Sequence, residues 1–134
     1  MIGLDTGPIV ALFDADDAAH ADCLAALKGQ RGPLVTCWPV LTEAFYLLGP
    51  DRQVQERLWT WLLSGAVRIQ DLDRQGMFRC RELMSQYGDL ALDLADAALV
   101  VTCERLDITR VFTTDRRDFH AIVPTHTSHF ELLP

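Results

Sequence analysis

The sequence predicts an α/β fold, a three-layer α/β/α sandwich around a central, mainly parallel sheet of four to five strands. Short apolar runs alternate along the chain with longer segments whose apolar residues recur at helical spacing. Most of the strand-like runs are apolar throughout, which is typical of parallel strands covered by helices on both faces. The 134 residues suit one hydrophobic core. We therefore expect a single domain over residues 1–134.

The first half of the chain contains clear start and stop signals. Pro8 follows a Thr6-Gly7 turn and suits the first turn of a helix, and Pro39 does the same later in the chain. Gly29 closes one helical pattern and Gly49-Pro50 closes another. We expect strands at residues 2–4 and 34–37, and helices at residues 8–13, 18–27 and 39–48.

The second half continues the alternation. Residues 66–72 alternate between apolar and polar positions, which indicates a strand with one exposed face. Residues 92–106 are apolar nearly all round and predict a buried helix. We further expect helices at residues 53–63 and 76–87, a strand at residues 110–114, and an edge strand built from residues 122–123 with residues 130–132.

Four carboxylates lie in segments that should be apolar: Asp5, Glu43, Asp96 and Asp115. An isolated ionised carboxylate in an apolar interior is very costly. Cationic partners are missing from three of the four segments, since nearby arginines flank only Asp115. Asp5 and Asp115 each follow a predicted strand, and parallel strands place their carboxyl ends at the ligand-binding edge of a sheet.

A shared divalent cation accounts for all four acids at once. Mg²⁺ and Mn²⁺ favour oxygen ligands, and a bound ion offsets repulsion between carboxylates. We expect Asp5, Asp96 and Asp115 to hold one or two such ions, directly or through water. Glu43 would complete the site, either by ligating an ion or by orienting the attacking water.

Further polar residues near these acids have two open interpretations. Asp93 lies three positions before Asp96, so it either assists on the same helical face or caps that helix. Asp118 either supports the site from the outer sphere or caps a short helix that follows. Three threonines are auxiliary candidates: Thr6, Thr113 and Thr114. Thr6 and Thr114 are also explained as turn residues only, whereas Thr113 or Thr114 would orient a carboxylate or a metal-bound water molecule.

The chain resembles the PIN-domain family, and within it the VapC-like toxins of bacterial toxin–antitoxin pairs. The resemblance covers the whole length and rests on four segments in order: LDTGPIVALFDADDAAH, LTEAFYLL, DLALDLADAALVVTCERL and RVFTTDRRDF. These give Asp5, Glu43, Asp96 with Asp93 as an assistant, and Asp115 with Asp118. One departure is Gly7, where the family more often carries Ser or Asn.

The resemblance implies a metal-dependent endoribonuclease, the toxin of a toxin–antitoxin pair, that hydrolyses RNA phosphodiester bonds with metal-activated water. It also implies a homodimer and a small antitoxin protein whose tail enters the acidic site, often with a basic residue. Arg116 and Arg117 are candidates for contacts with the RNA backbone, or a solvated pair on a turn. Two other functions stay open: a non-catalytic acidic pocket that binds a basic peptide or RNA, and a metal-dependent phosphatase.

The bulk properties limit these functions. A net charge of −7 disfavours a protein that coats nucleic acid with a broad basic face, but it permits binding through metal. The four cysteines are scattered, and we expect buried, reduced thiols. No apolar run approaches the length of a membrane span and no secretory leader is present. We therefore expect a cytoplasmic protein without membrane contact.

Overall fold

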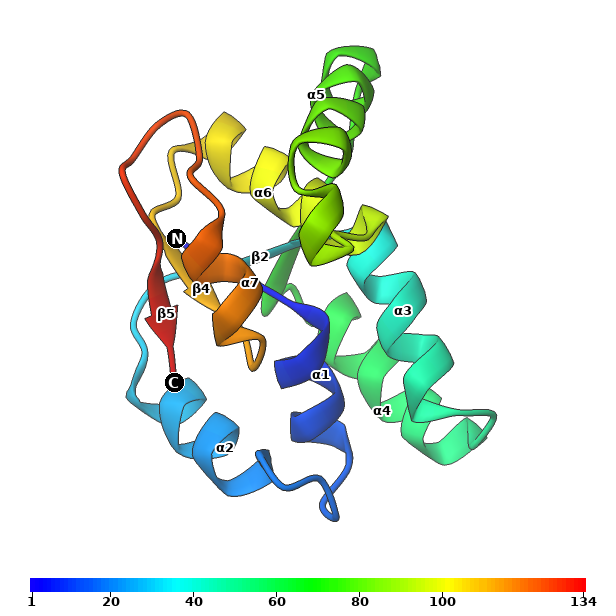
Figure 1. Cartoon of the computed structure of the whole chain (residues 1–134). Helices are drawn as coiled ribbons and strands as arrows, with labels where there is room; N and C mark the ends of the chain where they lie inside the picture. Colours follow the sequence, from blue (N-terminus) through cyan, green and yellow to red (C-terminus); the bar gives the residue numbers. More distant parts are fainter.

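The computed structural model describes all residues from 1 to 134 and contains a five-stranded sheet with strand order β3-β2-β1-β4-β5 (Figure 1). All four strand pairings are parallel. The predicted α/β fold is therefore confirmed. The strands are β1 (Ile2–Leu4), β2 (Leu34–Cys37), β3 (Val67–Gln70), β4 (Arg110–Phe112) and β5 (Glu131–Leu133).

The central position of β1 explains its apolar sequence. Gly3 of β1 faces Val35 of β2 on one side and Val111 of β4 on the other. Every residue of β1 and β2 is buried, whereas the edge strands β3 and β5 are partly exposed. The apolar–polar alternation of the third strand in the sequence therefore reflects its place at the edge of the sheet.

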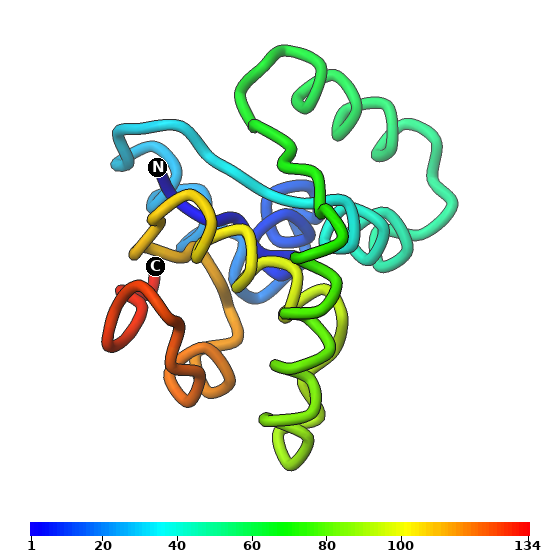
Figure 2. The backbone as a smooth tube through the Cα atoms, turned by 90° about the horizontal axis from the view of Figure 1, so that it is seen from above, coloured from blue at the N-terminus to red at the C-terminus, as the bar shows by residue number.

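Helices cover both faces of the sheet. In Figures 1 and 2, α1 and α2 lie on one side of the sheet and α6 lies on the other. A short 3-10 turn, η1 (Gly88–Leu90), precedes α6. The helices are α1 (Thr6–Phe13), α2 (His20–Gly29), α3 (Trp38–Leu48), α4 (Arg52–Leu63), α5 (Arg74–Gln86), α6 (Leu94–Leu106) and α7 (Arg116–Ala121).

Helix α6 is the most buried helix, as its sequence predicts. Residues 97–103 of this helix are buried without interruption. A Cβ atom at Gly3 of β1 would lie only 2.7 Å from the sulfur of Cys103. The absence of a side chain at Gly3 therefore lets α6 pack directly against the centre of the sheet.

The expected edge strand needs correction. Residues 122–123 form no strand, because Ile122 caps the C-terminus of α7 and buries its side chain there. The edge strand is β5 alone, paired with β4.

All four cysteines are buried and unpaired, as predicted. None of the helices combines the length and the apolar composition that crossing a bilayer requires.

Candidate active site

The sequence-predicted acids gather at the carboxyl ends of the three central strands. Asp5 follows β1, Asp115 lies three residues after the end of β4, and Glu43 is on the helix that directly follows β2. Asp96 lies in the first turn of α6, which packs against β1 and β2. Residues up to 110 positions apart in the chain therefore meet because all the strands run in the same direction.

Both carboxylate oxygens of Asp5 accept a hydrogen bond. The backbone N–H of Thr6 donates to Oδ1 at 2.7 Å, and the hydroxyl of Thr113 donates to Oδ2 at 2.6 Å. Burial nevertheless raises the pKa of Asp5 to about 6, since it outweighs these two hydrogen bonds, and Glu43 and Asp115 raise it further. Asp5 is thus a rigidly placed carboxyl group with a tendency to hold a proton.

Three of the acids are helix N-caps. Asp5 caps α1, Asp93 caps α6 through the N–H of Asp96 at 2.9 Å, and Asp115 caps α7 through the N–H of Asp118 at 3.2 Å. The positive ends of these helix dipoles therefore point into the acidic cluster and partly offset its charge. The cap of α7 is Asp115, so the interpretation of Asp118 as that cap is wrong.

The acids affect one another's protonation. Burial raises the pKa of Asp96 to about 8, and the charges of Asp5, Asp93 and Asp115 add to this rise. Burial also raises the pKa of Glu43, and the charge of Asp93 raises it further. The pKa of Asp118 is raised by burial and by Asp115, and lowered by Arg117. These groups form one electrostatic unit, which we call the acidic cluster: Asp5, Glu43, Asp93, Asp96, Asp115 and Asp118.

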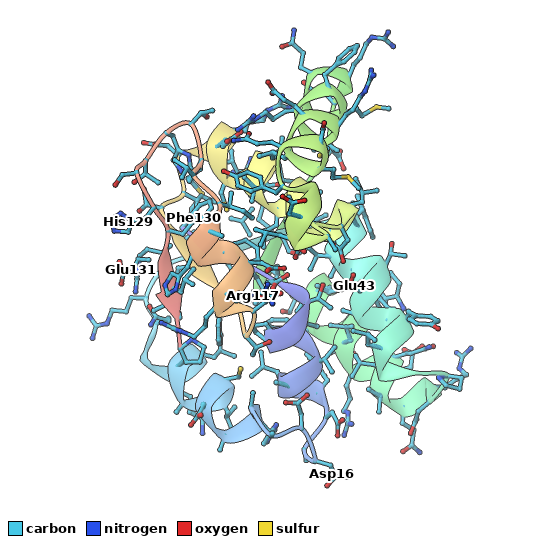
Figure 3. The ribbon with its side chains drawn as sticks, viewed as in Figure 1. Asp16, Glu43, Arg117, His129, Phe130 and Glu131 are labelled. Atoms are coloured by element: carbon cyan, nitrogen blue, oxygen red, sulfur yellow. The ribbon has the colours of Figure 1, made fainter.

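No arginine forms an ion pair with the acidic cluster. The ion pairs of the chain are Arg52–Glu56, Arg79–Glu82, Arg79–Glu104, Arg105–Asp73 and Arg110–Glu131. Arg116 donates to the carbonyl of Pro134 at 2.7 Å. Figure 3 shows Arg117 on α7 and Glu43 on α3 around the same central region, with Asp16 far away at the end of the molecule beyond α1.

The donor set fits a hard divalent cation in its chemistry, because every member is a carboxylate without a cationic partner. The geometry is less complete. No three acidic, histidine or cysteine side chains are placed so that one ion could bind them together. The capping hydrogen bonds of Asp5, Asp93 and Asp115 engage one oxygen of each carboxylate. Ion binding therefore requires at least one carboxylate to rotate.

The threonines differ in what they do. Thr113 is fully buried and joins Asp5 to the backbone N–H of Asp115. The hydroxyl of Thr6 lies 3.4 Å from the carbonyl of Val40 in α3. The side chain of Thr114 occupies the space beside Gly7, where a Cβ atom would overlap its hydroxyl. The absence of a side chain at Gly7 therefore leaves room for the side chain of Thr114.

Two residues at this edge were missed as site residues. Thr36, within the apolar strand β2, donates to the carbonyl of Leu4 at 2.8 Å and fixes the backbone just before Asp5. Its signal was the same as that of the acids, a polar residue inside an apolar run. Trp38, the first residue of α3, is 48% exposed and lines the same pocket as Glu43.

Comparisons with known proteins identify the family and the fold. A family model described as the PIN domain matches residues 2–123. Ribonuclease VapC26 of Mycobacterium tuberculosis is 28% identical over 133 residues, which is 98% of each chain. The crystal structure of M. tuberculosis VapC20, described as a sarcin-ricin loop cleaving toxin, aligns over 100% of both chains with a TM-score of 0.86 at 20% identity. A toxin–antitoxin complex from Klebsiella pneumoniae aligns over 91% of this chain and 92% of its own, with a TM-score of 0.68 at 21% identity.

Proposed function

This chain belongs to the PIN domain family, and on that premise we propose that it is an endoribonuclease, the toxin component of a toxin–antitoxin system. It hydrolyses RNA phosphodiester bonds with the help of Mg²⁺ or Mn²⁺. The similarity to ribonuclease VapC26 along almost the whole chain supports the nuclease activity. The fold shared with a toxin and with a toxin–antitoxin complex supports the biological setting.

One observation carries the proposal. Asp5, Glu43, Asp96 and Asp115 come from four separate segments, yet Glu43 and Asp115 raise the pKa of Asp5, and Asp5 and Asp115 raise the pKa of Asp96. None of the four forms an ion pair with an arginine. A cluster of acids with a purely structural role would be neutralised by bases or replaced by apolar residues. A cluster that binds a cation needs neither.

We assign a role to each residue. Asp5, Asp96 and Asp115 would hold the ion, and Asp5 is oriented for this by Thr113. The ion, when bound, would lower the pKa of a water molecule and neutralise charge on the phosphate. Glu43 lies on the facing helix with a raised pKa, which suits it to accept a proton from the attacking water. Attack by water on phosphorus, with cleavage of the bond to the 3′ oxygen, leaves a 5′-phosphate on one product and a 3′-hydroxyl on the other.

The partners follow from the same proposal. We propose that a small antitoxin protein blocks the acidic cluster and that the enzyme acts on RNA in the cytoplasm. A cluster of unpaired carboxylates attracts a basic side chain, so charge complementarity supports an inhibitor that presents Arg or Lys. Arg117, which forms no ion pair and lies beside Asp118, is available to contact the RNA backbone.

We also propose a homodimer and place its surface on α5. Met77, Phe78 and Met84 are large apolar side chains that stay exposed on this helix. Helix α4 also carries two tryptophans, Trp59 and Trp61. Trp61 packs against Phe13 with ring centroids 5.5 Å apart, which makes it an internal contact. Phe78→Glu is expected to yield monomers in analytical ultracentrifugation, and an unchanged mass would exclude this surface.

The activity is tested with structured and single-stranded RNAs in Mn²⁺, Mg²⁺ or EDTA. We expect the unmodified protein to cleave only with metal and to leave 5′-phosphates. Asp5→Asn and Asp96→Asn should lose at least about 100-fold in rate, because even changes behind a metal ligand cost 10- to 100-fold. The matched control is Asp16→Asn, an exposed aspartate far from the cluster (Figure 3).

Equal cleavage by all variants would identify a contaminating nuclease and remove the enzyme claim. Hydrolysis of phosphomonoesters with intact internal linkages would identify a phosphatase instead. Tight binding of RNA or of a basic peptide without any cleavage would identify a non-catalytic module.

A further inference from the structure

A half-exposed aromatic groove lies beside the acidic cluster. It has a volume of about 610 Å³ and is lined by Trp38, Thr42 and Tyr46 from α3 and by Leu94 from the start of α6. The three α3 residues are four positions apart and therefore form one stripe on the helix. A volume of this size is typical of ligand sites, which span roughly 300–1,000 Å³.

The groove opens into the candidate active site. Glu43 and Asp93, two members of the acidic cluster, belong to its wall. Trp38 is the first residue of α3 and follows directly after β2, so its position is set by the same strand end that places Glu43. Whatever occupies the groove is thus next to the place where the RNA phosphate is cleaved.

The chemistry of the lining selects the occupant. Trp38 is 48% exposed and Leu94 50% exposed, so large apolar surfaces face solvent at the mouth of the groove. A phosphate would be repelled by the carboxylates of Glu43 and Asp93, whereas a nucleobase is uncharged and offers flat faces to aromatic rings. Base edges also carry N–H donors that carboxylates accept.

We propose that Trp38 stacks on an unpaired base of the RNA next to the cleaved bond. This inference rests on the proposed ribonuclease function and assigns Trp38 as a residue that binds its substrate. A base in a duplex is stacked on its neighbours and would first have to leave them. A second copy of the chain is the less favoured occupant, because the exposed Met77 and Phe78 of α5 line a separate surface.

The test compares Trp38→Leu, which keeps an apolar side chain without a ring, with Trp38→Phe, which keeps a ring. Trp59→Leu is the matched control, since Trp59 is 39% exposed on α4 and packs against Phe45 rather than into the groove. The probes are a short single-stranded oligoribonucleotide of mixed sequence and the same strand in a duplex. The readouts are tryptophan emission on addition of RNA, kcat and KM in Mn²⁺, and sedimentation.

We expect the single strand to quench emission of the unmodified protein and to quench Trp38→Phe less. Trp38→Leu should raise KM roughly 5- to 160-fold with little change in kcat, because stacking is worth about 1–3 kcal/mol per base. Trp38→Phe should largely restore KM, and Trp59→Leu should resemble the unmodified protein. The duplex should be bound and cut less well than the single strand.

Unchanged KM and unchanged quenching in Trp38→Leu and Trp38→Phe would overturn the inference while leaving the ribonuclease intact. A change in sedimentation of Trp38→Leu with unchanged KM would assign the groove to a second copy and overturn it as well. If no variant cleaves RNA, the proposed function fails, and the quenching experiment still decides whether a base stacks on Trp38.

Discussion

The hydroxyl of Thr113 donates to Oδ2 of Asp5 across 2.6 Å and thereby joins the end of β4 to the end of β1. The same hydroxyl accepts the backbone N–H of Asp115 at 2.9 Å. One buried side chain therefore positions two of the four acids that the sequence places in apolar segments. It also satisfies a buried carboxylate that would otherwise lack a partner on that side.

Thr113→Val, which keeps the shape of the side chain, is expected to cost about 1–3 kcal/mol in the free energy of unfolding, because buried polar groups lose their partner. The pKa of Asp5 should rise further, since the Thr113 hydrogen bond lowers it. The acidic limb of the pH–rate profile should then move to higher pH. Thr113→Ser should restore stability and profile. A Val variant with an unchanged profile would separate Thr113 from the protonation of Asp5.

Asp96 makes the metal-free protein less stable at high pH. Its folded-state pKa of about 8 lies above its ordinary value of 3.8, so between these values the folded protein binds a proton that the unfolded chain has released. Stability in EDTA should therefore fall as the pH rises from about 4 to about 8. Asp96→Asn has no proton to release at this position. Its free energy of unfolding at pH 8 should therefore be about 1 kcal/mol higher than that of the unmodified protein, a figure that allows for screening by solvent.

Urea denaturation at about pH 5 and about pH 8 measures this difference, with Asp16→Asn as the exposed control. An Asp96→Asn protein with the pH dependence of the unmodified chain would show that Asp96 releases its proton as readily as an aspartate in water.

Much of the fold is predictable because the buried strands are short apolar runs with clear ends. Strand β2 has the predicted bounds, and the carboxylates that interrupt apolar segments do gather at one edge of the sheet. Residues 122–123 were misassigned because an apolar pair reads alike in a strand and after a helix. The pairing of β4 with β5 depends on contacts between separate segments, so neither segment alone predicts it.

The roles of Thr113 and Thr114 could not be told apart from the sequence. They are adjacent and identical, and only the direction of the backbone after β4 decides that Thr113 points to Asp5 while Thr114 lies against Gly7. The same limit applies to Asp115 and Asp118. Both precede or begin the short helix α7, and the position of its first turn decides which of them is the cap.

Gly7 and Thr114 are expected to be energetically coupled. A side chain at position 7 would overlap the hydroxyl of Thr114, so Gly7→Ser alone should destabilise the protein by about 1–3 kcal/mol. Adding Thr114→Ala should recover most of this loss. A double-mutant cycle in urea measures the coupling, and strict additivity of the two changes would show that the backbone relaxes instead.

Variants of Asp93 separate its role as the cap of α6 from the negative charge that it adds to the acidic cluster. Asp93→Ser keeps a cap for α6 without the charge, whereas Asp93→Ala removes both. The free energy of unfolding should fall by about 1 kcal/mol for Ala and stay nearly unchanged for Ser. Cleavage should fall in both variants if the carboxylate serves the site. Full activity in Asp93→Ser would leave Asp93 with the cap alone.

The central claim is that the acidic cluster binds a divalent cation, and isothermal titration calorimetry with Mn²⁺ near neutral pH tests it most directly. We predict saturable binding by the unmodified protein and by Asp16→Asn, and affinity at least about tenfold weaker in Asp96→Asn. Absence of binding by the unmodified protein, or equal affinity in Asp96→Asn, would contradict the claim.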